Sequence, residues 1–175
     1  MHHTSNRVLF LITYMIFFPL FTLLIFVIPQ TAYAQICETR ILASDGQSND
    51  SFTYDLAISG DVALIGAPNV DDVDINAGAA YIYRFDGAGN WIEEAKLYAP
   101  DGATGDQFGS AVSVSGDVAL IGSWWSDVNG HDSGSAYIFR YDGINWIMEQ
   151  QLAAYDADES DYFGSSVAIN GDTAI

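Results

Sequence analysis

Residues 108–122 read Phe-Gly-Ser-Ala-Val-Ser-Val-Ser-Gly-Asp-Val-Ala-Leu-Ile-Gly, and closely similar stretches begin at Phe52 and at Phe163. The three phenylalanines are separated by 56 and 55 residues. Self-similarity at a nearly fixed spacing is typical of a repeat architecture, in which each copy is one supersecondary unit that stacks on its neighbours. The fold therefore follows from the structure of one copy.

The rest of the unit repeats as well. Residues 78–87, Gly-Ala-Ala-Tyr-Ile-Tyr-Arg-Phe-Asp-Gly, return at 134–143 as Gly-Ser-Ala-Tyr-Ile-Phe-Arg-Tyr-Asp-Gly. In the second copy, four short segments rich in β-branched, aromatic or alternating apolar residues predict four strands, at 112–114, 118–121, 135–140 and 146–152. Ser-Gly-Asp and Asp-Gly between them are tight-turn sequences. Four antiparallel strands in each unit of about 55 residues are typical of a β-propeller blade, whereas solenoid repeats are shorter, at about 20–45 residues.

The repeat predicts an all-β fold of about two and a half propeller blades, which form an incomplete ring because closed propellers contain roughly four to eight blades. Residues 36–42 match the fourth strand of a blade when they are shifted by one repeat. We therefore expect 35–42 to be an N-terminal closing strand, 43–97 blade 1, 98–152 blade 2 and 153–175 a truncated blade 3. The remaining blades, or another chain, would complete the ring.

Residues 1–34 have the layout of a secretory signal peptide. Arg7 precedes an apolar run from Val8 to Ile28, and the small-residue site Ala32-Tyr33-Ala34 follows it. This order predicts a hydrophobic signal helix that is cleaved after Ala34. About 20 apolar residues also span a bilayer, so an uncleaved anchor is the alternative. In either case we expect a secreted or cell-surface protein that contacts a membrane only through this leader.

The chain is strongly acidic, with 23 Asp and Glu residues against five Lys and Arg and a formal net charge of −18. Such a surface repels phosphate backbones, which excludes nucleic acid as the expected partner. An acidic surface of this kind serves solubility or holds cations in acidic loops.

Two corresponding polar loops are candidate calcium sites. The candidate ligands are Asp71, Asp72, Asp74 and Asn76 in the first loop, and Asp127, Asn129 and Asp132 in the second. Carboxylate and amide oxygens at alternating positions can surround one calcium ion. Asp and Asn also dominate ordinary turns because they tolerate left-handed backbone and bond locally. Both interpretations remain open at this point, as they do for the acidic loops between repeats at 45–50, 101–106 and 156–161.

Trp124 and Trp125 are a pair that occurs once, at the end of an expected strand. Two roles are open for them: stacking on a sugar or a partner side chain, and packing within the blade. No catalytic residue is assigned, because the sequence contains neither G-x-S-x-G nor H-E-x-x-H. His131 is the one histidine after the leader, and it lies in a polar turn.

Phe108-Gly109, the run 118–122 and Gly66-Ala67-Pro68 together resemble the FG-GAP repeat, which builds the β-propeller of integrin α-subunits and of many bacterial exported proteins. The resemblance covers residues 36–175. Thr53 follows Phe52 where the motif has glycine, and Gly122-Ser123-Trp124 stands in place of Gly-Ala-Pro.

Integrin-type blades usually carry an Asp-x-Asp-x-Asp-Gly calcium loop where this chain has only Ser-Gly-Asp, at 59–61 and 115–117. The chain thus resembles the short-turn bacterial branch of the family. The resemblance implies a non-enzymatic extracellular binding, adhesion or scaffold module, with a protein or glycan ligand at the blade loops. The alternative is a propeller-type carbohydrate-active enzyme, a lyase or glycosidase, with its site in missing blades.

Overall fold

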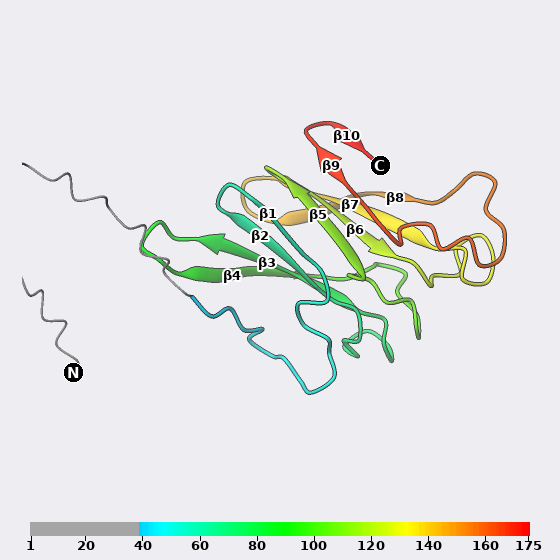
Figure 1. The fold of residues 1–175 in the computed structure, drawn as a ribbon, viewed down its shortest axis with the longest axis horizontal. Helices are drawn as coiled ribbons and strands as arrows, with labels where there is room; N and C mark the ends of the chain where they lie inside the picture. The colour runs from blue at the N-terminus through cyan, green and yellow to red at the C-terminus, as the bar shows by residue number, and fades with distance from the viewer. Residues whose placement is uncertain (1–38) are drawn as a thin grey trace, which may run out of the picture. The chain divides into compact units, whose positions relative to one another are not determined.

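The computed structural model describes residues 39–175, which form two four-stranded antiparallel sheets and a terminal hairpin (Figure 1). Sheet 1 contains β1 (Leu56–Ser59), β2 (Val62–Ala67), β3 (Ala79–Phe85) and β4 (Trp91–Leu97). Sheet 2 contains β5 (Ala111–Ser115), β6 (Val118–Ser123), β7 (Ser135–Tyr141) and β8 (Trp146–Leu152). The hairpin pairs β9 (Ile169–Asn170) with β10 (Thr173–Ala174).

The predicted all-β class and the four antiparallel strands of each unit are confirmed, and residues 39–175 contain no helix. In sheet 2 the observed strands match the predicted segments to within two residues at each end. The predicted signal helix lies outside the described residues, and so do positions 35–38 of the predicted closing strand. Thr39 to Ala43 form no strand. Because the closing strand was expected to pair with the last blade of a complete ring, it stays a prediction.

In the part of the chain that the structure describes, no helix is long and apolar enough to cross a membrane.

Equivalent residues pair in the two sheets. Ile65 pairs with Tyr81 in sheet 1, and Ile121 pairs with Tyr137 in sheet 2. Each third strand also shifts register against the fourth strand at the same place, between Ile82 and Tyr83 and between Ile138 and Phe139. The sequence repeat is therefore a structural repeat down to its β-bulge, which increases local twist.

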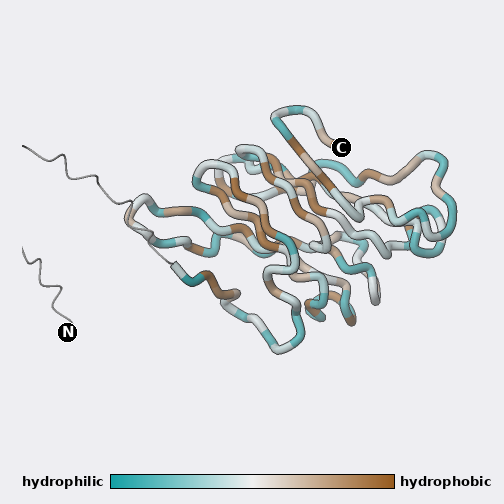
Figure 2. Tube along the Cα trace, in the orientation of Figure 1, coloured by the Kyte–Doolittle hydropathy of each residue, from teal (hydrophilic) through white to brown (hydrophobic). Residues whose placement is uncertain are grey.

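Alternate residues of each strand face opposite sides of its sheet. Val62, Leu64 and Ile82 of sheet 1 pack against Ile121 and Tyr137 of sheet 2 in one buried cluster. Figure 2 shows the hydrophobic residues concentrated in the strands and the hydrophilic ones in the loops. The sheets are consequently stacked face to face around an apolar core.

The opposite face of sheet 1 is covered by residues from the segment that precedes it. Ile41, Ala43 and Phe52 pack against a second cluster that contains Ile65 and Tyr81. The Phe52 ring meets the Tyr81 ring edge-on, with centroids 5.3 Å apart. This face thus has the same aromatic cover that the equivalent face of sheet 2 receives from Phe108.

In sheet 2 the Phe108 ring lies 5.4 Å from the Tyr137 ring and is fully buried. Its backbone forms a parallel bridge to Gly78 of the preceding unit, and Phe163 forms the same bridge to Gly134. Each Phe-Gly segment therefore joins its own unit to the unit before it, and residues 163–175 begin a third unit with the same contact.

Candidate functional site

The candidate site residues lie on two loops at one end of the sheets. The β2–β3 loop comprises residues 68–78, and the β6–β7 loop comprises residues 124–134. In the first, Asp71 Oδ1 accepts a hydrogen bond from the Asn76 amide at 2.7 Å. In the second, Asp127 Oδ1 accepts one from the Asp132 amide at 2.8 Å. One carboxylate thus closes each loop, as Asp commonly does in turns.

The following inter-sheet segment holds each loop in place. The amides of Gly105 and Gln107 donate to the carbonyls of Ile75 and Asn76 at 2.8 and 3.1 Å. Around the second loop, the Ser160 and Tyr162 amides donate to the carbonyls of His131 and Asp132 at 2.9 and 3.2 Å. Both loops are therefore braced by main-chain hydrogen bonds, and their side chains project from a fixed scaffold.

Among the described residues, Asp71, Asp72 and Asp74 of the first loop do not form a group of three converging carboxylates. Asp72 Oδ2 accepts hydrogen bonds from Lys96 Nζ at 2.5 Å and from the Tyr98 hydroxyl at 2.8 Å, and these bonds lower the pKa of Asp72. Asp74 accepts a bond from the Ile75 amide, which lowers the pKa of Asp74. Asp71 and Asp72 each have hydrogen-bond partners within the protein, as the turn interpretation expects, and calcium binding by this loop stays a prediction.

The sequence analysis missed Lys96, a β4 residue whose side chain contacts this loop. Its ammonium group also donates to Asp45 at 2.7 Å and lies 4.9 Å from the centre of the Tyr81 ring. Burial lowers the pKa of Lys96, but the bonds to Asp45 and Asp72 outweigh burial and raise it. A built-in cation thus balances the carboxylates of the first loop.

The second loop brings together two of its three candidate ligands and adds a histidine. Ligand atoms of Asp127, His131 and Asp132 all lie within 4.8 Å of one another. Asn129 is directed elsewhere, because its side-chain amide donates to the Ala154 carbonyl at 3.3 Å. The sequence signal for this group was available in the adjacent pair His131-Asp132, but only the fold places Asp127 beside it.

The acidic residues between repeats have structural roles. Asp50, Asp106 and Asp161 each accept a hydrogen bond from the amide three residues earlier, at 2.7–2.9 Å. Asp106 is almost fully buried, and this burial raises its pKa. Asp101 accepts a bond from the buried Tyr137 hydroxyl at 2.7 Å. For these residues the turn interpretation accounts for the carboxylates.

The tryptophan pair begins the β6–β7 loop. It occupies the positions that Pro68 and Asn69 occupy in the first repeat. The Trp124 ring packs between Trp125 and Tyr162, at centroid distances of 5.6 and 5.9 Å. Its indole nitrogen donates to the Gln107 side chain at 2.9 Å. Trp125 is 43% exposed, so Trp124 is a packing residue and Trp125 presents an aromatic face to solvent.

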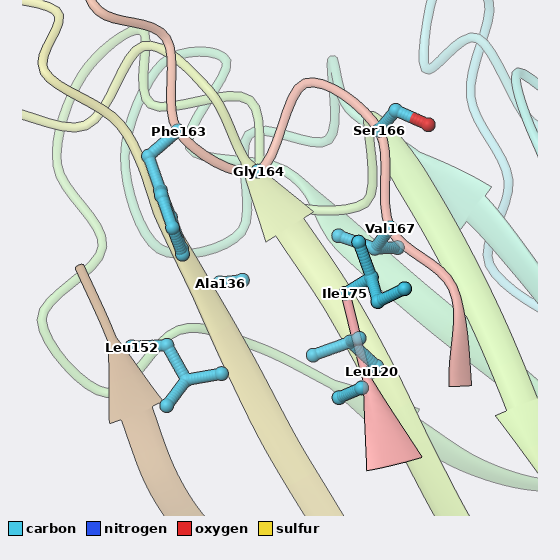
Figure 3. A pocket seen from close by; sticks show the side chains of 9 residues that line it. Leu120, Ala136, Leu152, Phe163, Gly164, Ser166, Val167 and Ile175 are labelled. Atoms are coloured by element: carbon cyan, nitrogen blue, oxygen red, sulfur yellow. The ribbon is translucent and has the colours of Figure 1, made fainter. Parts of the chain in front are cut away.

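A cavity of about 380 Å³ lies between sheet 2 and the third unit (Figure 3). Leu120, Ala136 and Leu152 line one side, and Phe163 and Val167 line the other. The Phe163 side chain faces sheet 2 through apolar contacts, without the ring partners that Phe52 and Phe108 have among the described residues. The cavity thus lies where the third unit stacks on sheet 2, and it offers few polar groups to orient a ligand.

A family model described as FG-GAP repeat matches three segments of the chain, residues 37–83, 91–139 and 146–175. No curated protein matches the chain.

Proposed function

Because this chain belongs to the FG-GAP repeat family, we propose that its sheets are successive blades of a β-propeller that acts as an exported binding module. The observation that carries this proposal is the repeated packing step. Phe108 bridges to Gly78, and Phe163 bridges to Gly134 in the same way. A constant step between units that each present a sheet face generates a ring when its rotation closes, as it does in propellers of about four to eight blades.

Export is supported by the signal layout of residues 1–34. The expected result is a processed chain that begins at Gln35 and is recovered outside the producing cell. N-terminal sequencing of the secreted fraction measures this, and an intact chain that remains in the cytoplasm would contradict it.

Binding rather than catalysis is supported by the roles that the titratable groups already have. The carboxylates with a lowered pKa are bonded to Lys96, to Arg84 or to loop amides. The tyrosines with a raised pKa are buried between sheets or bonded to a carboxylate. These shifts are explained by packing, so they do not call for an acid–base pair.

The ligand surface that we propose is the loop end of sheet 2, around the exposed face of Trp125. Flat aromatic rings stack on sugar rings and on partner side chains, and tryptophan is enriched at binding surfaces for this reason. The expected ligand is therefore a glycan or an extracellular protein, held at the same end of the blades as the β2–β3 and β6–β7 loops.

The experiment is a binding screen against immobilised glycans and extracellular-matrix proteins. It compares the purified chain with a Trp125→Ala variant and an Ile144→Ala control. Ile144 is 80% exposed in the β7–β8 turn, at the opposite end of the sheet 2 strands from the β6–β7 loop, so the control removes an exposed apolar side chain without touching the proposed surface. Binding that is lost in Trp125→Ala and kept in Ile144→Ala supports the proposal. Ligands retained equally by both variants would move the binding surface elsewhere.

A further inference from the structure

We propose that Asp127, His131 and Asp132 form a site for a divalent transition metal ion such as Zn²⁺. One ligand atom from each residue lies within 4.8 Å of the other two. His131 Nδ1 and Asp132 Oδ2 are 3.1 Å apart. A tetrahedral zinc ion with nitrogen and oxygen ligands at about 2.0–2.2 Å places neighbouring donors roughly 3.3 Å from each other. This pair already has nearly that spacing, and the Asp127 carboxylate supplies the third donor within 4.8 Å.

The donor types favour zinc over calcium. Imidazole nitrogen binds zinc, copper and nickel, whereas calcium takes six to eight oxygen ligands. The third candidate ligand of this loop, Asn129, donates its side-chain amide to the Ala154 carbonyl. Three protein donors leave an open coordination position for water or for a ligand atom, as in zinc sites that are not purely structural.

The first loop supplies an independent comparison within the same chain. It has the same closing bond, from the Asn76 amide to Asp71, and nearly the same positive φ at Asn76 (52°) as at Asp132 (53°). Ile75 stands where His131 stands in the second loop. The loop scaffold therefore forms without the histidine and without the second carboxylate, so folding of the loop does not account for these two donors.

The charges around the group also favour a cation. The Lys and Arg side chains in the ion pairs of residues 39–175 contact Asp45, Asp61, Asp72, Glu94 and Glu149. Asp127 and Asp132 have no such partner among these pairs, and the basic group beside them is His131. Lys96, the β4 cation that contacts the first loop, is replaced in β8 by the neutral Gln151. A bound metal ion would balance the carboxylates of Asp127 and Asp132.

The test is isothermal titration of the purified full chain with Zn²⁺ and, in parallel, with Ca²⁺. All samples carry His2→Ala, His3→Ala and Cys37→Ser, which remove the other histidines and the cysteine. The decisive variant is His131→Ile with Asp132→Asn, which gives the second loop the residues of the first and so preserves a fold that the chain already contains. We expect one Zn²⁺ per chain, and a loss of affinity of at least about 10-fold in the variant, since even outer partners of metal ligands matter by about 10–100-fold.

The reciprocal variant, Ile75→His with Asn76→Asp, is expected to raise the zinc stoichiometry from one to two. Histidine ring signals in the NMR spectrum of the unsubstituted loop give a second measurement that does not depend on the folding of a variant. Zinc is expected to shift the His131 signals at one equivalent. No zinc binding, equal binding in the His131→Ile and Asp132→Asn variant, or calcium binding of equal strength would each overturn the proposal and leave an ordinary histidine–carboxylate pair.

Discussion

Gly66 lies directly against the carbonyl group of Gly109, so that a Cβ atom on Gly66 would stand 1.9 Å from the Gly109 oxygen. Gly122 has the same relationship to Gly164, at 2.0 Å. Each glycine lies on the second strand of one unit, and its partner follows the phenylalanine of the next unit. The glycine at the end of the Val-Ala-Leu-Ile-Gly strand thus contacts the glycine of the next Phe-Gly pair, and this contact lets consecutive sheets approach closely.

Replacing Gly66 by Ala should lower the free energy of unfolding by about 1–3 kcal/mol, the usual cost of forcing extra atoms into a packed interior. The obstructing atoms belong to the backbone of Gly109, so no side-chain rotation relieves the contact. Urea denaturation monitored by circular dichroism measures the change.

Gly60→Asn is the matched control for this substitution. Gly60 has a φ of 61° in an exposed turn, and a Cβ there meets nothing within 4 Å. Because Asn tolerates the left-handed region, the control should change stability little. Equal effects of Gly66→Ala and Gly60→Asn would contradict the close approach of the two sheets.

Phe108→Ala should be among the most destabilising single substitutions in the chain, at about 3–5 kcal/mol, the range for removing a buried aromatic side chain. The Phe108 ring is fully buried against Tyr137 and Phe139. Phe163 occupies the corresponding position of the third unit but is only half-buried, so Phe163→Ala should cost less. Thermal unfolding of the two variants gives the comparison, and a larger loss for Phe163→Ala would reverse the order of packing inferred here.

Substitutions of Trp124 and Trp125 should differ in their effect on the free energy of unfolding. Trp124→Phe removes the hydrogen bond to Gln107 and should lower stability by about 1 kcal/mol, whereas Trp125→Phe should leave it nearly unchanged. Chemical denaturation of the two variants measures this difference. If Trp125→Phe proved the more destabilising, Trp125 would be a packing residue and the proposed ligand surface would lose its central side chain.

Much of this fold was predictable because its signals are local and repeated. The apolar run 118–121 and the aromatic strand 135–140 each predict a strand, and the copy at the expected spacing confirms the unit. The role of the Phe-Gly glycine was not predictable in this way. Thr53 takes a positive φ of 70° in the first unit, where glycine is absent. Glycine is therefore tied to the close approach of a preceding sheet, and a single copy of the sequence does not reveal that contact.

The candidate site shows the same limit. Alternating carboxylates in 69–76 suggested a shared ion, but Asp72 turns to Lys96, which lies in the fourth strand of the sheet. His131 was noted only as a solitary histidine, because its approach to Asp127 depends on the closing bond within the loop. Composition identified the loops, and long-range contacts decided what each side chain in them does.

Stability should fall as the pH drops below the ordinary carboxylate range near 4. Hydrogen bonds from Lys96 lower the pKa of Asp45 and Asp72 in the folded chain, and Arg84 lowers that of Glu94. The unfolded chain therefore takes up protons first as the pH decreases, so the stabilisation is lost through the folded pKa values. Buried Asp106, with its pKa raised, has the opposite sign and offsets part of the loss.

Urea midpoints measured between pH 7 and pH 3 test this dependence. Asp106→Asn is an informative variant, because it removes the group whose protonation favours the folded state. Its stability relative to the parent should worsen as the pH falls. A parent midpoint that stays constant, or rises, between pH 5 and pH 3 would contradict the assignment of these carboxylates.

The charge arrangement around Lys96 can be tested by replacing Lys96 and its partner Asp72 with the residues found at the corresponding positions of the second repeat. Lys96→Gln alone should lower stability by about 1–2 kcal/mol, a range reduced for the solvent exposure of Asp45 and Asp72, because Asp72 then loses its cation. At the corresponding positions of sheet 2 the chain has Gln151 and Val128, and Gln151 donates to both Asp101 and the Tyr137 hydroxyl. Adding Asp72→Val to Lys96→Gln recreates that set, since the introduced glutamine would then serve Asp45 and Tyr81.

The double variant should consequently recover most of the stability that Lys96→Gln loses. A double-mutant cycle over Asp72 and Lys96, measured by urea denaturation, gives the coupling free energy directly. The expected coupling is favourable and decreases with added salt, because the carboxylates are partly exposed. Additive losses would mean that Lys96 stabilises the sheet through Asp45 and the Tyr81 ring, independently of Asp72. Asp72 would then contribute nothing to the charge balance that distinguishes the two repeats.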